Sequence, residues 1–375
     1  MNFHQLLEKM VSADASDMFV TAKLAVSAKI NGELHPISDQ VLSAEESLGL
    51  VYDAMNEKQI RQFNEEKECN FAISIENIGR FRISAFWQRD MAGMVIRRIV
   101  TVIPDVEDLG LPPILTDVVM SKRGLLLFVG GTGTGKSTSM ASLIGYRNRH
   151  SRGHILTIED PVEFVHEHAK SMITQREVGL DTESFDAALK SSLRQAPDVI
   201  LIGEIRSQET MEYALSFAET GHLCIATLHA NNANQAIDRI MHLVPAEQHG
   251  KLLFDLALNL RGIIAQQLIP TRDGNGRIAA IEVLLNSPYV AELIKKGEIG
   301  SIKEVMKKSN ELGMQTFDQA LFNLYKTDLI TYADAIHHAD SPNDLRLMIK
   351  LKSNDQSGSG GLSGVTIEGF EPKVD

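Results

Sequence analysis

The chain has 375 residues, of which 43% are hydrophobic and 23% charged, values close to those of average soluble globular proteins. This length predicts two or three domains. Acidic residues outnumber basic ones by 49 to 37, for a formal charge of −12, and this disfavours a surface built to neutralise nucleic-acid phosphates. We therefore expect compact globular domains and no nucleic-acid partner.

The two cysteines, Cys69 and Cys224, are too few for a disulfide framework or a four-thiolate zinc site. We expect both to be buried thiols in a reducing cytoplasm. The first 22 residues lack the features of a signal peptide, and no stretch approaches the roughly 18 apolar residues of a membrane span. The protein is therefore expected to be cytoplasmic, which leaves peripheral attachment to a membrane open.

Residues 1–100 predict a small α+β domain. Helical spacing of apolar residues predicts a helix over 3–11, and 43–65 is also expected to be helical. Asn31-Gly32 predicts a hairpin turn, because both residues tolerate positive φ angles. Extended segments are expected at 17–20, 25–30, 69–76, 79–89 and 93–100.

The proline-rich segment 101–113 suits neither a helix interior nor a central strand, so it is the expected hinge linker. Over 114–285, apolar strands alternate with helical stretches, the pattern of a parallel sheet covered by helices on both faces. Residues 286–352 predict a small helical subdomain. The Gly/Ser-rich composition after it predicts a flexible tail over 353–375.

A glycine-rich loop follows the apolar strand 125–129 and leads into a helix near Ser137. Its sequence, GGTGTGKS, fits the pattern G-x-x-x-x-G-K-S in full, and the flanking strand and helix disfavour a chance glycine-rich turn. Backbone N–H groups in such a loop point at a β-phosphate. The residues expected to bind ATP are Gly131, Thr132, Gly133, Thr134, Gly135, Lys136, Ser137 and Thr138. Lys136 would contact the β- and γ-phosphates, and the hydroxyl of Ser137 or Thr138 would bind Mg²⁺.

The next expected strand, 154–158, ends in a group of carboxylates. Glu159, Asp160 and Glu163 lie within five residues and would repel one another without a cation or proton among them. A Mg²⁺–nucleotide site meets this need, and we assign Glu163 as the catalytic base that activates water. For Asp160, the alternative is a helix cap before Pro161.

Two further strands bring polar residues to their ends. The expected strand 199–202 has Asp198 before its start and Glu204 after its end. Because a strand advances about 3.3 Å per residue, these two carboxylates lie roughly 20 Å apart and Asp198 cannot share the site. Glu204 is therefore the expected Mg²⁺ ligand, directly or through water. The last strand begins at His222 and ends at His229, whose imidazole would sense the γ-phosphate. His222 is also a candidate catalytic residue, and a core position is the alternative for it.

Ligands of an open parallel sheet bind outside the carboxyl ends of its strands, and four strands here end in suitable residues. This agreement indicates one hydrolytic nucleotide site. His166 and His168 are instead expected to be solvated, because no nearby Cys or His completes a metal shell.

Three longer segments resemble motifs of the secretion ATPase superfamily, the hexameric motors of type II and type IV secretion and of type IV pili. Residues 193–206 resemble its signature, 157–164 its aspartate box and 218–229 its histidine box. Residues 15–18 together with 30–33 resemble its PAS-like N-terminal domain. The resemblance covers about residues 1–345. It implies an α/β fold, with a PAS-like α+β domain, a RecA-like P-loop ATPase domain and a helical C-terminal subdomain.

Assembly and secretion ATPases of this superfamily usually carry a four-cysteine zinc motif, which this chain lacks. In this respect, and in the segment 313–321, it resembles the retraction branch, which comprises the PilT and PilU types. Three departures from the PilT pattern are similar to the accessory PilU type: the changed segment 203–207, the absence of two arginines from 289–297, and the added tail after Lys352. The resemblance implies a homo-hexameric ATPase at the inner membrane that powers pilus retraction and twitching motility. Its implied partners are a PilT-like retraction ATPase and an inner-membrane pilus platform protein.

The resemblance further assigns Arg82 and Arg97 of the N-terminal domain to the γ-phosphate. A delocalised guanidinium stabilises the charge of a metaphosphate-like transition state. Surface-facing strand arginines are the alternative, and Arg194 and Arg239 are candidates for a subunit interface.

Two other functions stay open at this point. A largely non-catalytic adaptor of a partner motor is favoured by the altered segment 289–297, whereas the complete nucleotide motifs count against it. A nucleic-acid translocase would be stimulated by DNA, which the charge balance disfavours.

Overall fold

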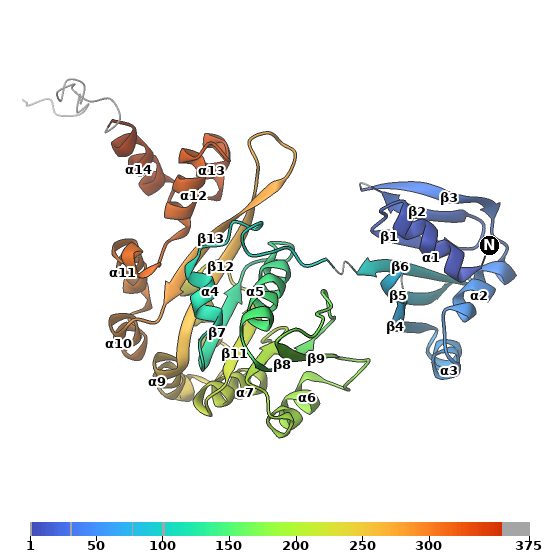
Figure 1. Cartoon of the computed structure of the whole chain (residues 1–375), viewed down its shortest axis with the longest axis horizontal. Coiled ribbons are helices and arrows are strands. Elements are labelled where there is room, and N and C mark those ends of the chain that lie inside the picture. Colours follow the sequence, from blue (N-terminus) through green and yellow to red (C-terminus); the bar gives the residue numbers. More distant parts are fainter. Residues whose placement is uncertain (1, 31, 77, 100–101, 355–375) are drawn as a thin grey trace, which may run out of the picture.

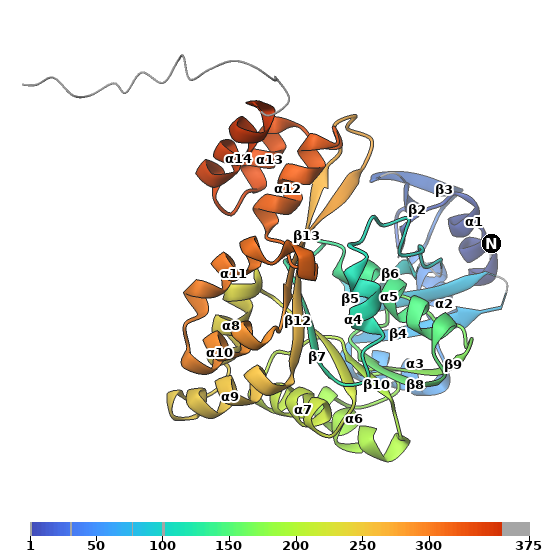
Figure 2. The same cartoon turned by 60° about the vertical axis from the view of Figure 1, so that its left-hand side comes forward.

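The computed structural model describes residues 2–30, 32–76, 78–99 and 102–354. Within them, the chain forms an N-terminal domain around a six-stranded antiparallel sheet and a larger domain around a seven-stranded sheet (Figure 1). The larger domain carries a group of C-terminal helices beside its β12–β13 edge (Figure 2). The predicted α/β class, with a preceding α+β domain, is therefore confirmed.

The N-terminal sheet has the strand order β3-β2-β1-β6-β5-β4. Its strands are β1 (Asp17–Thr21), β2 (Ala25–Ile30), β3 (Glu33–Val41), β4 (Glu68–Ile75), β5 (Gly79–Gln88) and β6 (Met91–Ile99). Its helices are α1 (Phe3–Ser12), α2 (Ala44–Asp53) and α3 (Glu57–Glu66). Asn31 lies outside the described residues, but Ile30 pairs with Glu33, so β2 and β3 form the expected hairpin. Sequence reasoning missed β3, an edge strand that tolerates Pro36.

The predicted helix over 43–65 is two helices. The first, α2, ends at Asp53, and Asn56 caps the start of α3, since its side chain accepts a 3.0 Å hydrogen bond from the Gln59 N–H. Such a cap satisfies a donor that the first turn of a helix leaves free.

The sheet of the larger domain has the order β13-β12-β7-β11-β10-β8-β9. Its strands are β7 (Gly124–Val129), β8 (Gly153–Glu159), β9 (Ser171–Glu177), β10 (Val199–Ile202), β11 (Leu223–Leu228), β12 (Leu260–Pro270) and β13 (Arg277–Leu285). Five neighbouring pairs are parallel, but β12 and β13 form an antiparallel hairpin. The expectation of a wholly parallel sheet was therefore wrong at this edge.

Helices cover both faces of this sheet. The helices of the ATPase region are α4 (Ile114–Val119), α5 (Lys136–His150), α6 (Phe185–Ser192), α7 (Gln208–Glu219), α8 (Ala233–Met241) and α9 (His249–Asn259). Alternate side chains of β7 point to opposite faces, so Leu125 and Leu127 join the core under α6–α9, whereas Leu126 and Phe128 pack with α4 and α5. This alternation explains why β7 reads as a continuous apolar run.

The C-terminal segment is helical, as predicted. Its helices are α10 (Pro288–Lys296), α11 (Ile302–Lys308), α12 (Phe317–Lys326), α13 (Tyr332–His338) and α14 (Pro342–Asn354). The helix α14 includes residues 353–354, which were expected to belong to the flexible tail, and 355–375 lie outside the described residues. Among the described helices, none is both long and apolar enough to cross a membrane.

Part of the proline-rich linker packs onto the larger domain. Val106 and Leu111 are buried in the core that contains α4 and α5. The Asp105 carboxylate also accepts a 2.6 Å hydrogen bond from Arg149 of α5. These contacts anchor the linker from Asp105 onward, whereas residues 100–101, at its start, lie outside the described ranges.

A buried carboxylate joins the sheet to two helices. Glu282 of β13 is 2% exposed and accepts hydrogen bonds from the backbone N–H groups of Ala233 at 2.8 Å and Phe317 at 3.4 Å, the first residues of α8 and α12. Burial raises the pKa of the Glu282 carboxyl to about 7, Asp340 adds to the rise, and the two N–H donors and Lys303 oppose it.

We expect Glu282 to make unfolding depend on pH. Because its folded-state pKa of about 7 lies above the ordinary value of 4.5, its stabilising effect is fully present below pH 4.5 and is lost as the pH rises through 7. One pKa unit corresponds to about 1.4 kcal/mol, so the loss should approach about 3 kcal/mol. Urea unfolding at several pH values should show a smaller decline for Glu282→Gln than for the wild type. Equal declines in the two proteins would contradict this assignment.

Candidate functional site

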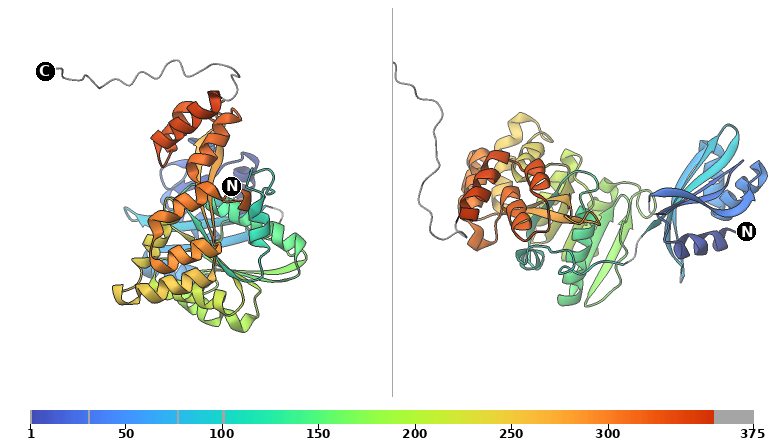
Figure 3. Two further views of the ribbon diagram at one scale, coloured as in Figure 1. Left: turned by 90° about the vertical axis from the view of Figure 1, so that its left-hand side faces the viewer. Right: turned by 90° about the horizontal axis from the view of Figure 1, so that it is seen from above.

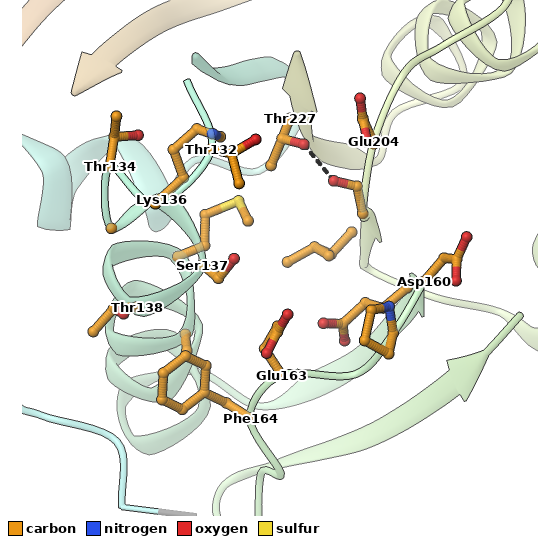
Figure 4. Close-up of a pocket in the computed structure, with 18 of the residues that line it drawn as sticks. Thr132, Thr134, Lys136, Ser137, Thr138, Asp160, Glu163, Phe164, Glu204 and Thr227 are labelled. Carbon is orange, nitrogen blue, oxygen red and sulfur yellow. Dashed lines mark hydrogen bonds between the residues drawn. The ribbon is translucent and has the colours of Figure 1, made fainter. Parts of the chain in front are cut away.

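The carboxyl ends of four adjacent strands surround one cavity. In the sheet, β7, β11, β10 and β8 are consecutive and parallel, so the segments that follow them meet at the same edge (Figure 4). The cavity measures about 610 Å³, a size typical of small-molecule sites. The residues that line it include many of the site residues predicted from the sequence: Thr132, Gly133, Thr134, Gly135, Lys136, Ser137, Thr138, Glu163, Glu204 and His229. Gly131 lines an adjoining hollow together with His229 and Arg239.

The glycine-rich loop packs tightly against β12. A Cβ atom at Gly130 would lie 2.6 Å from the carbonyl oxygen of Gln266, and one at Gly135 would lie 2.8 Å from its side-chain nitrogen. Gly135, at φ +85°, directly precedes the first residue of α5. The loop therefore needs glycine both for its backbone conformation and for its contact with β12.

Lys136 begins α5 and is folded onto the loop. Its Nζ donates hydrogen bonds to the carbonyl oxygens of Gly130 at 2.8 Å and Gly131 at 2.7 Å. Burial lowers the pKa of Lys136, and the nearby Glu204 carboxylate opposes that change. The cation is thus held at the cavity by neutral carbonyl groups that a phosphate could replace as its partners.

Gly130→Ala should destabilise the chain, whereas Gly131→Ala should not. A new Cβ meets the β12 backbone at 2.6 Å in the first case, but its nearest neighbour is 3.9 Å away in the second. Enforced backbone strain costs about 1–3 kcal/mol, so we expect a loss of that size for Gly130→Ala and a change within about 0.5 kcal/mol for Gly131→Ala. Urea denaturation of both variants measures the difference, and equal stabilities would refute it.

The carboxylates at the end of β8 have different surroundings. Glu159 accepts hydrogen bonds from the Thr157 hydroxyl at 2.6 Å and the Gln175 amide at 3.3 Å. Burial raises the pKa of Glu159, with smaller contributions from Glu163 and Glu177. Glu163 is exposed and extends into the cavity opposite the start of α5 (Figure 4).

The alternative role of Asp160 as a helix cap was wrong, because the described chain contains no helix between β8 and β9. Asp160 instead lines the cavity, and it also lines a second one toward the N-terminal domain. The loop that carries Asp160 and Glu163 therefore separates two cavities.

The Glu204 carboxylate is held by the guanidinium of Arg206 and the imidazole of His229. One of its oxygens accepts from the Arg206 Nε at 2.7 Å, and the other lies 3.2 Å from the His229 Nε2. The hydrogen bond with Glu204 raises the pKa of Arg206. The Thr227 hydroxyl donates to the Gly203 carbonyl oxygen and so ties the end of β11 to that of β10 (Figure 4). These bonds fix Glu204 at the wall of the cavity that Lys136 also lines.

Sequence reasoning assigned no role to Arg206 or Gln266. Arg206 could have been suspected from its position two residues beyond Glu204, the spacing that lets the two side chains pair. Gln266 gave no such signal, because it lies in a strand that was not expected and is remote in sequence from the loop it supports.

His222 is not brought to the cavity. It precedes β11, at the end of the strand opposite to His229, and its ring nitrogen lies 3.1 Å from the Thr220 hydroxyl and 3.2 Å from the Phe217 carbonyl oxygen. In this arrangement it fastens the turn between α7 and β11.

Arg82 and Arg97 face a different cavity, which lies between the two domains and measures about 530 Å³. They sit opposite each other on β5 and β6, and Arg97 donates a 2.8 Å hydrogen bond to Asp17. The two domains lie beside each other with the β8–β9 edge facing the N-terminal sheet (Figure 3). Within one chain, these arginines therefore stand next to the first cavity but do not line it.

Two lesser expectations have separate outcomes. His166 is half-buried, and so less solvated than predicted: it lines the first cavity, and burial, helped by Arg149, lowers its pKa to about 4. His168 is exposed, and its Nδ1 accepts a 3.1 Å hydrogen bond from the Ile173 N–H. Cys69 and Cys224 are both buried free thiols, as expected.

Comparison with known proteins places this architecture in a family. Residues 2–321 match the family described as type II/IV secretion system protein, and the chain belongs to it. It is 59% identical over 366 residues to the type IV pilus ATPase PilU of Pseudomonas aeruginosa, a match that covers 98% of this chain and 95% of the relative. It is 38% identical over 344 residues to the type IV pilus retraction ATPase PilT of the same organism, with coverages of 92% and 100%.

A solved structure agrees with these relatives. The crystal structure of the pilus retraction motor PilT with bound ADP matches with a TM-score of 0.87 at 37% identity, over 93% of this chain and 100% of that one. The chain is thus a PilU-like pilus ATPase of the PilT/PilU branch, which confirms the resemblance seen in its motifs.

Proposed function

We propose that the chain binds Mg²⁺-ATP in the cavity at the ends of β7, β11, β10 and β8, hydrolyses it to ADP and phosphate, and thereby helps to power type IV pilus retraction. The main support for this proposal is that the phosphate-binding loop, Glu163 and Glu204 all line one cavity. The ADP bound in the related PilT structure supports the nucleotide assignment.

The chain's own groups fit a triphosphate. The loop leaves no room for a side chain at Gly130 or Gly135, so its backbone can come close to a ligand. Residues 136–138 open the first turn of α5, where unpaired N–H groups and the helix dipole favour an anion. Lys136 would exchange its carbonyl partners for phosphate oxygens.

The oxygen donors Ser137 and Glu204 suit Mg²⁺, which prefers hydroxyl and carboxylate oxygens. When bound, this ion would neutralise charge on the phosphate oxygens. Arg206 and His229 would keep Glu204 oriented. Glu163, exposed in the same cavity, would accept the proton of the attacking water.

The arginines of the N-terminal domain require movement or a second subunit. Arg82 and Arg97 line the interdomain cavity, which shares Asp160 with the nucleotide cavity. A ring of six copies would bring them to a γ-phosphate as domains close. Since the linker is anchored from Asp105 onward, the pivot would lie before that residue.

The proposed setting is the cytoplasmic face of the inner membrane, with peripheral attachment. The partners would be a PilT-like retraction ATPase and the pilus platform protein, with this chain acting as the accessory PilU-type subunit. The 59% identity to PilU supports this choice over a PilT-type role.

Lys136→Ala should abolish ATP hydrolysis by the purified chain. Removing one well-placed charge-stabilising donor costs about 100-fold or more in rate. Lys170→Ala, which removes an exposed lysine outside the cavity, is the matched control and should stay within about twofold of the wild type. A normal rate for Lys136→Ala would overturn the site. Nucleotide binding without any wild-type turnover would instead favour the adaptor role, and stimulation by DNA a translocase.

Pilus retraction in cells that lack the chain tests the biological role. Wild-type protein should restore retraction force, whereas Glu204→Ala should not, because its carboxylate would no longer hold the metal ion. Force measurements on single pili provide the readout, with protein levels matched between strains. Full rescue by Glu204→Ala would show that the chain's own hydrolysis is dispensable.

A further inference from the structure

One ion pair joins the N-terminal domain to the ATPase domain. Arg80 of β5 donates from Nη2 to the Glu177 Oε2 at 3.1 Å, and the two side chains are only 18% and 7% exposed. Arg80 pairs with Ile99, the last described residue before the linker. The contact therefore depends directly on how the N-terminal domain is placed.

The same Glu177 oxygen reaches the loop of the nucleotide cavity. Besides Arg80, the Glu177 Oε2 accepts a 3.2 Å hydrogen bond from the backbone N–H of Val162. Val162 is 1% exposed and directly precedes Glu163. A single carboxylate oxygen thus binds the N-terminal domain on one side and the Asp160–Glu163 loop on the other.

Glu177 itself is firmly placed. It ends β9, where its backbone N–H donates a 2.9 Å hydrogen bond to Asp181. It also lies beside Glu159 in the parallel pairing of β8 and β9. The carboxylate therefore sits at a rigid point of the sheet, and the partners around it are the parts that can move.

The charges explain why Arg80 matters to the loop. Glu177 is buried beside Glu159, and its charge adds to the rise of the Glu159 pKa that burial causes, so the two carboxylates disfavour each other's ionised form. A buried carboxylate that loses its cation is strongly unfavourable and turns toward water. This change weakens its hydrogen bond with Val162.

We propose that Glu177 is a positioning residue that holds the Glu163 loop in place only while Arg80 of the N-terminal domain neutralises it. Placement of the N-terminal domain is then sensed at the nucleotide cavity within the same chain. The inference rests on the proposed function, because it acts through the residue assigned to water activation.

Hydrogen exchange on the full chain tests the loop directly, without relying on turnover. Arg80→Ala should speed amide exchange in residues 160–164 by about tenfold, because the Val162 hydrogen bond weakens. The matched control is Arg98→Ala, which removes an arginine of the same sheet whose partner, Asp14 at 2.9 Å, lies within the N-terminal domain. Arg80→Lys, which keeps the charge, should protect the loop better than Arg80→Ala. Equal exchange in Arg80→Ala and Arg98→Ala would overturn the proposal.

Kinetics give a second readout. Arg80→Ala and Glu177→Gln should each lower kcat by about tenfold with KM changed less than about twofold, because they misplace Glu163 without touching the phosphate loop. The double variant should be no slower than the worse single variant, since both break one linkage. Additive losses, or an unchanged kcat in both single variants, would overturn the proposal. If the wild-type chain showed no turnover, the proposed ATPase function would be refuted but the positioning role of Glu177 would not. Hydrogen exchange would still decide that role.

Discussion

The parallel pairing of four adjacent strands is the constraint on which the site depends. Because β7, β11, β10 and β8 run in one direction and side by side, their carboxyl ends present Lys136, His229, Glu204 and Glu163 to a single cavity. These residues come from segments far apart in the chain. Hydrogen bonding between backbones, and not contact among the polar side chains, brings them together.

Burial then gives chemically similar side chains different properties. Glu159 is enclosed, which raises its pKa, whereas Glu163, four residues later, is exposed in the cavity. Glu204 keeps its place through Arg206 and His229. One edge of a sheet can thus hold a carboxyl group with a raised pKa, a solvent-facing one and an ion-paired one, and hydrolysis of a phosphate anhydride makes use of such differences.

The sequence was most informative where local physics decides the structure. The strand β10 and the phosphate loop were predicted correctly, because apolar runs and glycine spacing act over a few residues. The hairpin β12–β13 was missed, since polar residues such as Gln266 interrupt its pattern and become buried only through long-range packing. The partial burial of His166 and the contact of Arg80 with Glu177 also depend on tertiary structure. The spacing of residues along the chain cannot predict such contacts.

The hairpin β12–β13 connects two regions that sequence patterns treat separately. On β12, Gln266 abuts the phosphate loop, and on β13 its register partner Ile281 adjoins Glu282, which binds the starts of α8 and α12. Since the paired strands are joined by a continuous ladder of hydrogen bonds, they form one stiff unit. A ligand that displaced the phosphate loop would therefore push on the starts of α8 and α12 through this hairpin, over a path independent of the N-terminal domain.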